Sequence, residues 1–231
     1  MTDRRDVLLI AAHGERGGEG TNRRLAAIAD AVTALLPDTD VRHGVLSGEP
    51  SFAQALSGLD PQSKVTVFPL FMSKGYFVSR KLPDTLAGLA GSITMLDPLG
   101  TGPELAQTAA AALRALPGGP APHVLVIAHG SSKDDRSRRD AEAFAAGLSR
   151  RMHGCDVTCC FLEEQPFAGE AVATLQADAA IVSLFAGEGL HGGDDIPEIL
   201  IRTGFPDSRI VTPAADVTAV AAIIAARFRD A

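Results

Sequence analysis

The sequence predicts an α/β protein built from two similar halves, each a parallel sheet flanked by helices. Two observations predict this class: the chain repeats itself, and apolar runs alternate with amphipathic segments along its whole length. Residues 6–12, DVLLIAA, form an apolar run after the initial Asp6, as expected for a strand buried on both faces. The segment that follows at 21–37, TNRRLAAIADAVTALLP, spaces its apolar side chains as a helix does. Such alternation gives parallel sheets covered by helices.

The remaining elements follow in the same order in each half. Thr21 or Asn22 can cap the first helix, and Pro37 ends it. In the first half, further strands are expected near 40–46, 64–71 and 93–96, and further helices near 51–58, 82–89 and 103–116. In the second half, strands are expected near 123–128, 156–162, 179–185 and 209–212, and helices near 138–152, 167–175, 195–203 and 216–228.

The two halves are copies of one ancestral unit. VLLIAAHGERG at 7–17 returns as VLVIAHGSSK at 124–133, which aligns His13 with His129. The segments 43–56 and 159–175 also match, as do 65–86 and 179–200, and all matches keep their order. We therefore predict domains at 1–117 and 123–231, joined by a Pro- and Gly-rich linker at 118–122.

Composition excludes several classes of function. A net charge of −7, with one Tyr and no Trp, argues against a nucleic-acid or anionic-membrane partner. The first apolar run is too short for a signal peptide or a membrane span. The three cysteines, Cys155, Cys159 and Cys160, are odd in number and clustered, so a disulfide framework is not expected and a cytoplasmic location is. Cys159 and Cys160 should point to opposite faces of one strand, as buried thiols rather than a metal site.

Chemically active side chains are expected at one edge of each sheet. In parallel sheets, ligands bind beyond the carboxyl ends of the strands. The residues that follow the first three strands are His13, Ser47 and Phe77 in the first half, and His129, Glu163 and His191 in the second. These positions should converge in each half, and only the second half carries a full set of polar groups there.

The motifs IAHGS (127–131), FLE (161–163) and LF…G.H….DIP (184–197), taken in this order, resemble the class II chelatases. The sirohydrochlorin cobalt- and ferrochelatases of cobalamin and sirohaem biosynthesis are the most similar type. The resemblance covers nearly all of both halves. It implies two α/β subdomains that face each other across a tetrapyrrole-binding cleft, and insertion of Co²⁺ or Fe²⁺ into sirohydrochlorin without ATP.

The residue types agree with this chemistry. Metal insertion removes two pyrrole protons and strips water from the ion. A neutral imidazole binds first-row metals and accepts protons near neutral pH, and a carboxylate adds charge and a proton path. We expect His129, Glu163 and His191 to bind the metal and to act in catalysis, with Glu164 as an alternative to Glu163. Catalysis belongs to the second half, because Ser47 and Phe77 stand at two of these positions in the first.

Further residues are candidates for substrate binding. The eight carboxylates of sirohydrochlorin require cations. The sequence offers two clusters: Lys74, Arg80 and Lys81 after the third strand of the first half, and Lys133, Arg136, Arg138 and Arg139 after AHGSS. The backbone amide of Ser131, near a helix start, could hold a carboxylate. His13 either contacts the substrate or is a relic of the duplication. Asp195 either caps the helix that begins at Ile196 or orients His191 from behind.

Several alternatives stay open at this point. Histidine and glutamate suit cobalt, iron and nickel alike. A non-catalytic tetrapyrrole or metal carrier is the rival function, because the first half has diverged so far. A protohaem ferrochelatase fits less well, since no apolar lip is evident. The segment GERGGEGT lacks the ending of a phosphate-binding loop, so no nucleotide is expected. No prosthetic group is expected either, and two repeats in one chain are compatible with a monomer.

Overall fold

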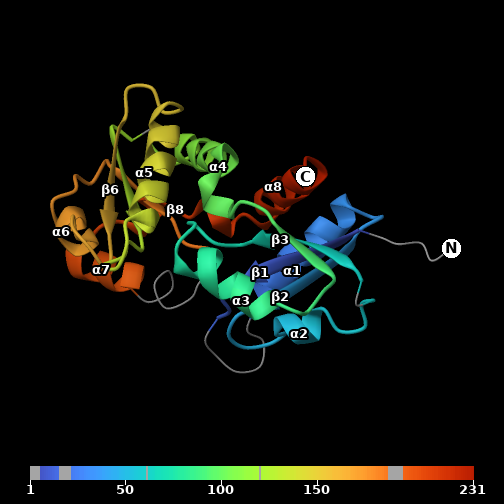
Figure 1. The fold of residues 1–231 in the computed structure, drawn as a ribbon. Helices are drawn as coiled ribbons and strands as arrows, with labels where there is room; N and C mark the ends of the chain where they lie inside the picture. Colours follow the sequence, from blue (N-terminus) through green and yellow to red (C-terminus); the bar gives the residue numbers. More distant parts are fainter. Residues whose placement is uncertain (1–5, 16–21, 61, 120, 187–194) are drawn as a thin grey trace. The chain divides into compact units, whose positions relative to one another are not determined.

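The computed structural model describes residues 6–15, 22–60, 62–119, 121–186 and 195–231 (Figure 1). The chain divides into two compact units. The first comprises Met1–Leu99 together with Val217–Ala231, and the second comprises Gly100–Asp216. Each unit contains one four-stranded parallel sheet, which confirms the predicted fold class. No helix in the described ranges is long and apolar enough to cross a membrane.

The first unit has the strand order β2-β1-β3-β4. Its strands are β1 (Val7–Ala12), β2 (Asp40–Val45), β3 (Lys64–Pro69) and β4 (Ser92–Met95). Its helices are α1 (Arg23–Leu35), α2 (Phe52–Ala55), α3 (Leu82–Leu86) and α8 (Val217–Arg229), and a π-helical turn, η1 (Phe77–Lys81), leads into α3. Leu9 of β1 and Val67 of β3 pack with Phe52 and Leu82 on one face of the sheet. Burial of apolar residues on both faces explains the uninterrupted apolar run in β1.

The second unit repeats this arrangement with the order β6-β5-β7-β8. Its strands are β5 (His123–Ala128), β6 (Asp156–Phe161), β7 (Ala180–Ser183) and β8 (Ile210–Val211). Its helices are α4 (Pro103–Arg114), α5 (Arg136–Ser149), α6 (Ala168–Ala173) and α7 (Ile196–Thr203), with short 3₁₀ turns η2 (Leu99–Thr101), η4 (Asp207–Arg209) and η5 (Pro213–Ala215). Leu125, Ile127 and Cys160 lie in the core that α6 and α7 cover. The predicted strands are present. β5 has the predicted bounds, β4 has the predicted length one position earlier, and β1, β2, β3, β6, β7 and β8 are one to three residues shorter than predicted.

The compact units differ from the predicted domains 1–117 and 123–231. Helix α4 ends the first sequence repeat but packs against α5 in the second unit, and α8 ends the second repeat but packs against α1 in the first. Arg229 of α8 donates a hydrogen bond to the carbonyl of Leu35 at 2.7 Å. The predicted linker therefore lies inside the second unit. Sequence similarity identifies the repeats, but it carries no information on which sheet the last helix covers.

Candidate active site

His129 and Glu163 lie side by side at the carboxyl edge of the second sheet. Their strands β5 and β6 are neighbours, with Ala128 paired to Phe161. The Nε2 atom of His129 is 3.8 Å from the Oε1 atom of Glu163, and the side chains are 39% and 49% exposed. A metal ion with bonds of about 2.1 Å holds two ligand atoms about 3–3.5 Å apart, so a small side-chain movement lets both atoms bind one ion. The predicted convergence of these two residues is confirmed.

A backbone contact sets the tautomer of His129. Its Nδ1 atom lies 3.0 Å from the carbonyl oxygen of Gly130. Because a carbonyl oxygen only accepts, Nδ1 must carry the hydrogen, and the neutral ring then has its lone pair on Nε2. A second hydrogen bond of this kind commonly fixes metal-binding histidines. The nitrogen of His129 that is free to bind a metal, Nε2, is thus the one that lies 3.8 Å from Glu163.

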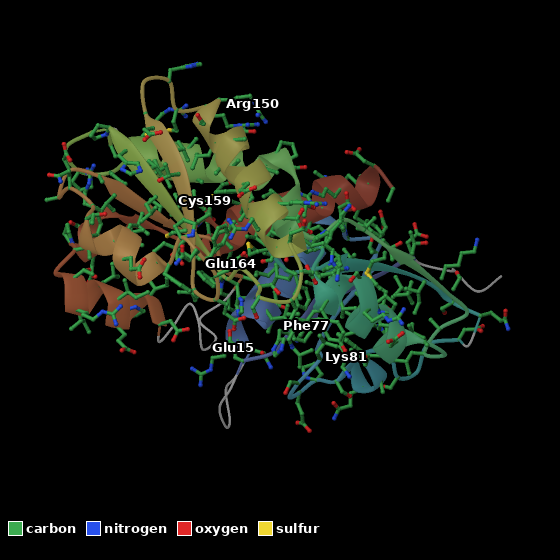
Figure 2. All side chains as sticks on the ribbon, turned by 60° about the vertical axis from the view of Figure 1, so that its left-hand side comes forward. Glu15, Phe77, Lys81, Arg150, Cys159 and Glu164 are labelled. Atoms are coloured by element: carbon green, nitrogen blue, oxygen red, sulfur yellow. The ribbon has the colours of Figure 1, made fainter. Side chains whose placement is uncertain are left out.

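Glu164, labelled in Figure 2, has a different role from its neighbour. Its Oε1 accepts a hydrogen bond from the amide of Ser131 at 2.9 Å, and its Oε2 accepts from Nε and Nη2 of Arg138 at 2.9 and 2.6 Å. The guanidinium of Arg138 also lies over the ring of Phe161, 4.6 Å from its centroid. The Glu164 clamp (Ser131, Arg138 and Glu164) ties the loop after β5 to the end of β6. Both oxygens of Glu164 are engaged, which leaves Glu163 as the carboxylate beside His129.

Gly130 allows this close approach. Its φ of +73° is a conformation that other residues rarely adopt. A Cβ atom at this position would lie 2.8 Å from both Cγ of Glu164 and Cβ of Phe161. The glycine of the IAHGS motif is therefore required by the contact between the loop and the clamp.

The predicted substrate-binding residues are only partly available. The amide of Ser131 donates to Glu164 at 2.9 Å, so Ser131 could hold a substrate carboxylate through this amide only if that bond were exchanged, and its role in substrate binding stays a prediction. Arg136 pairs with Asp134 at 2.9 Å, and hydrogen bonding to Arg136 lowers the pKa of Asp134. Lys74 pairs with Asp97 at 2.6 Å. Arg80 is exposed on η1. These three cations stay candidates for substrate contact.

The first unit shows how the third position of the site is arranged. The ring of His13 meets the ring of Phe77 edge-on, with centroids 4.7 Å apart, and the amide of Ser47 donates to the carbonyl of His13 at 2.9 Å. The three equivalent positions of this half thus converge at one sheet edge, as predicted. His191 corresponds to Phe77 but lies outside the described residues, so its predicted place beside His129 stays a prediction.

Asp195 occupies the position before the first residue of α7, but its side chain makes no capping hydrogen bond within the described part of the chain. The capping alternative is therefore wrong. The orienting alternative concerns His191 and is not tested. Pro197 is in the first turn of α7, where its missing N–H is tolerated.

Two features escaped the sequence reasoning. The first is the pairing of Arg138 with Glu164, because the two residues stand 26 positions apart in the sequence. The second is a set of aromatic side chains around Phe77, which includes Phe71 and Tyr76. The sequence held one signal for the second feature: three aromatic residues fall within 71–77 in a chain that is otherwise poor in aromatic residues.

No set of three His, Cys, Asp or Glu side chains lies close enough to hold a metal within the ranges that the structure describes. His129 and Glu163 supply two of the three predicted ligands. The third, His191, is outside these ranges, so the predicted set of three is not tested.

A known protein family matches each of the two repeats separately. The chain matches the CbiX family over residues 7–116 and 123–231. A probable sirohydrochlorin cobaltochelatase of Halobacterium salinarum is 23% identical over 221 residues, which cover 83% of this chain and 75% of the relative. The solved structure of CbiX, the terminal enzyme for biosynthesis of sirohaem in denitrifying bacteria, is 30% identical with a TM-score of 0.79, covering 98% of this chain and 99% of the other.

A more distant structure shares the fold. The sirohydrochlorin chelatase SirB from Bacillus subtilis subspecies spizizenii, in complex with cobalt, has a TM-score of 0.77 at 17% identity and covers 98% of this chain and 94% of the other. The family match spans both repeats, including His13, His129 and Glu163. The resemblance inferred from the three motifs is confirmed, and the chain belongs to the CbiX family of chelatases.

Proposed function

We propose that this protein inserts Co²⁺ or Fe²⁺ into sirohydrochlorin without ATP. The observation that carries the proposal is the pair His129 and Glu163, whose metal-binding atoms lie 3.8 Å apart at the carboxyl edge of the second sheet. Membership of the CbiX family supports the reaction class. Among the relatives, one is a probable cobaltochelatase and another is an enzyme of sirohaem biosynthesis, so both ions are candidates.

In the proposed reaction, one divalent ion enters the macrocycle and two pyrrole N–H protons leave. Nε2 of His129, the carboxylate of Glu163 and the imidazole of His191 bind the incoming ion and displace part of its water. As the ion passes from these groups to the macrocycle, their lone pairs become free to accept the two pyrrole protons, which then pass to solvent. Asp195 orients His191 in this proposal.

An anaerobic absorbance assay of sirohydrochlorin with Co²⁺, and separately with Fe²⁺, tests the function. We expect the protein to accelerate insertion, and the ratio of the two rates identifies its preferred ion. His129→Ala and Glu163→Gln should reduce insertion by about 10²-fold or more, because each removes a proton acceptor. His13→Ala should have a much smaller effect.

The rival function is a tetrapyrrole or metal carrier. A shifted sirohydrochlorin spectrum without acceleration for either ion would favour the carrier. Equal losses in His13→Ala and His129→Ala would contradict the assignment of catalysis to the second repeat. We further propose that the protein acts as a monomer, which size-exclusion chromatography with light scattering would test.

A further inference from the structure

An exposed aromatic cluster lies in the first unit. Its central residue, Phe77, corresponds in the repeat alignment to His191, the predicted metal ligand of the second repeat. The cluster comprises His13, Phe71, Tyr76 and Phe77. The ring of Phe77 is at its centre, with centroid distances of 4.7 Å to His13, 5.7 Å to Tyr76 and 6.3 Å to Phe71. Tyr76 and Phe77 are 57% and 41% exposed. The chain has ten Phe, one Tyr and no Trp, so this exposed gathering of rings departs from its general composition.

The cluster lies where a parallel sheet binds its ligands. His13 follows β1, and Phe71 follows β3, so both are at the carboxyl edge of the sheet. Phe77 begins the π-helical turn η1, a geometry that occurs frequently at functional sites. Phe71 packs against the core, and its ring stacks with the ring of Phe77. Phe77 therefore stacks on a side chain that is itself packed against the core.

Positive charge flanks the rings. Arg80 and Lys81 lie on the same turn as Phe77, and both are exposed. Figure 2 labels Phe77 and Lys81. Neither Arg80 nor Lys81 forms a salt bridge in the described part of the chain. Flat aromatic rings beside cations are complementary to a planar conjugated molecule that carries carboxylates at its rim.

We propose that the aromatic cluster is the surface on which the sirohydrochlorin macrocycle stacks, with Arg80 and Lys81 binding its peripheral carboxylates. This inference rests on the proposed function and adds a role for the first repeat. Ser47 and Phe77 replace the metal-binding residue types of the second repeat. The first repeat has thus exchanged metal chemistry for recognition of the substrate, at the same sheet edge.

The test is a titration of the intact protein with metal-free sirohydrochlorin, followed by the absorbance and fluorescence of the tetrapyrrole. We expect Phe77→Ala and Tyr76→Ala each to raise Kd about fivefold, because each removes one stacked ring. Tyr76→Phe keeps the ring and should bind as the wild type does. Leu35→Ala is the matched control, since Leu35 is an apolar side chain of α1 with 42% exposure and lies outside the cluster.

Metal insertion provides a second readout. Phe77→Ala should raise KM and leave kcat close to the wild-type value, because lost stacking weakens ground and transition states alike. The double variant Arg80→Ala/Lys81→Ala removes only exposed charge, so it should fold normally. It should weaken binding about tenfold at low salt and flatten the dependence of Kd on salt.

Wild-type Kd values in Phe77→Ala and Tyr76→Ala, in a protein that still metallates sirohydrochlorin, would overturn this inference alone. If the wild type neither binds nor metallates sirohydrochlorin, the proposed function fails instead. Circular dichroism reports whether each variant is folded. Should Phe77→Ala unfold, Tyr76→Ala and the double charge variant decide the question, because their side chains are largely in solvent.

Discussion

Glu163 and Glu164 are adjacent in the sequence, yet their carboxylates meet different partners. Glu163 faces the imidazole of His129, while Glu164 binds Arg138 and the amide of Ser131. The backbone amide of Glu163 also donates to the carbonyl of His129 at 3.1 Å. One carboxylate therefore faces the candidate metal position, and the other fixes the loop that carries the histidine. The clamp holds the loop that carries His129, and its own carboxylate is engaged by Ser131 and Arg138.

Removing the charge of Glu164 tests whether this residue stabilises the loop that carries His129. We expect Glu164→Gln to lower the free energy of unfolding by about 2 kcal/mol, because it weakens charge-assisted hydrogen bonds to a partly buried group. Glu142→Gln is the matched control: Glu142 also approaches Arg138, at 3.7 Å, but is 53% exposed. It should change stability by less than about 0.5 kcal/mol. Urea denaturation measures both, and equal effects would contradict the clamp.

At this scale, the sequence predicted which residues are chemically active but not how they are held. His129 and Glu163 were predictable because each follows a buried strand, and strand ends of a parallel sheet converge. The choice between Glu163 and Glu164 was not, because it depends on the χ angles of two neighbouring side chains. The engagement of the Ser131 amide depends on the same choice.

Strand β6 shows how one element serves two environments. Cys159 points toward α5, where its thiol contacts the carbonyl of Ala141, and Cys160 lies in the core beneath α6 and α7. The prediction that these neighbours face opposite sides is confirmed. Burial raises the pKa of both thiols to about 12, with a smaller contribution to Cys159 from Glu142.

The raised pKa values predict low thiol reactivity. Because the thiolate is the nucleophile, a pKa of about 12 leaves on the order of 10⁻⁴ of each thiol reactive at pH 8. We expect iodoacetamide to modify Cys155 first in the native protein, and Cys159 and Cys160 only after denaturation. Peptide mass spectrometry distinguishes the sites. Comparable modification of all three cysteines in the native state would contradict the assignment.

Elements with strong patterns were predictable, and those set by tertiary contacts were not. Strand β1 is apolar on both faces, and α1 has a clear apolar stripe. Helix α2 is shorter than the expected 51–58, since it consists of residues 52–55 after a capping box at Ser51 and Gln54. The π-helical geometry of η1 has no signature in the letters FVSRK.

For the whole molecule, the exchange of end helices is the main departure from expectation. Arg227 of α8 lies over the ring of Phe68 and donates to the carbonyl of Pro98 at 3.0 Å. Val220, Ile223 and Ile224 of the same helix are buried. The helix that completes the first sheet is thus the last one in the chain.

Deletion of residues 217–231 distinguishes the compact units from the sequence repeats. Loss of three buried aliphatic side chains removes about 5 kcal/mol or more, which is comparable to the whole stability of a domain. We expect hydrogen exchange to show lost protection in β1 and α1, while β5 and α5 keep theirs. If protection were lost only in the second unit, the repeats would be the folding units after all.

The position of α8 has a consequence for how the protein is made. A chain that leaves the ribosome ordinarily folds its N-terminal domain first. Here the first unit stays incomplete until residues 217–231 emerge, because they belong to this unit and Arg229 donates to the carbonyl of Leu35, 194 positions earlier. The second unit, which is contiguous from Gly100 to Asp216, can finish while the first still waits. The half of the protein that carries His129 and Glu163 is synthesised later but is the first able to fold.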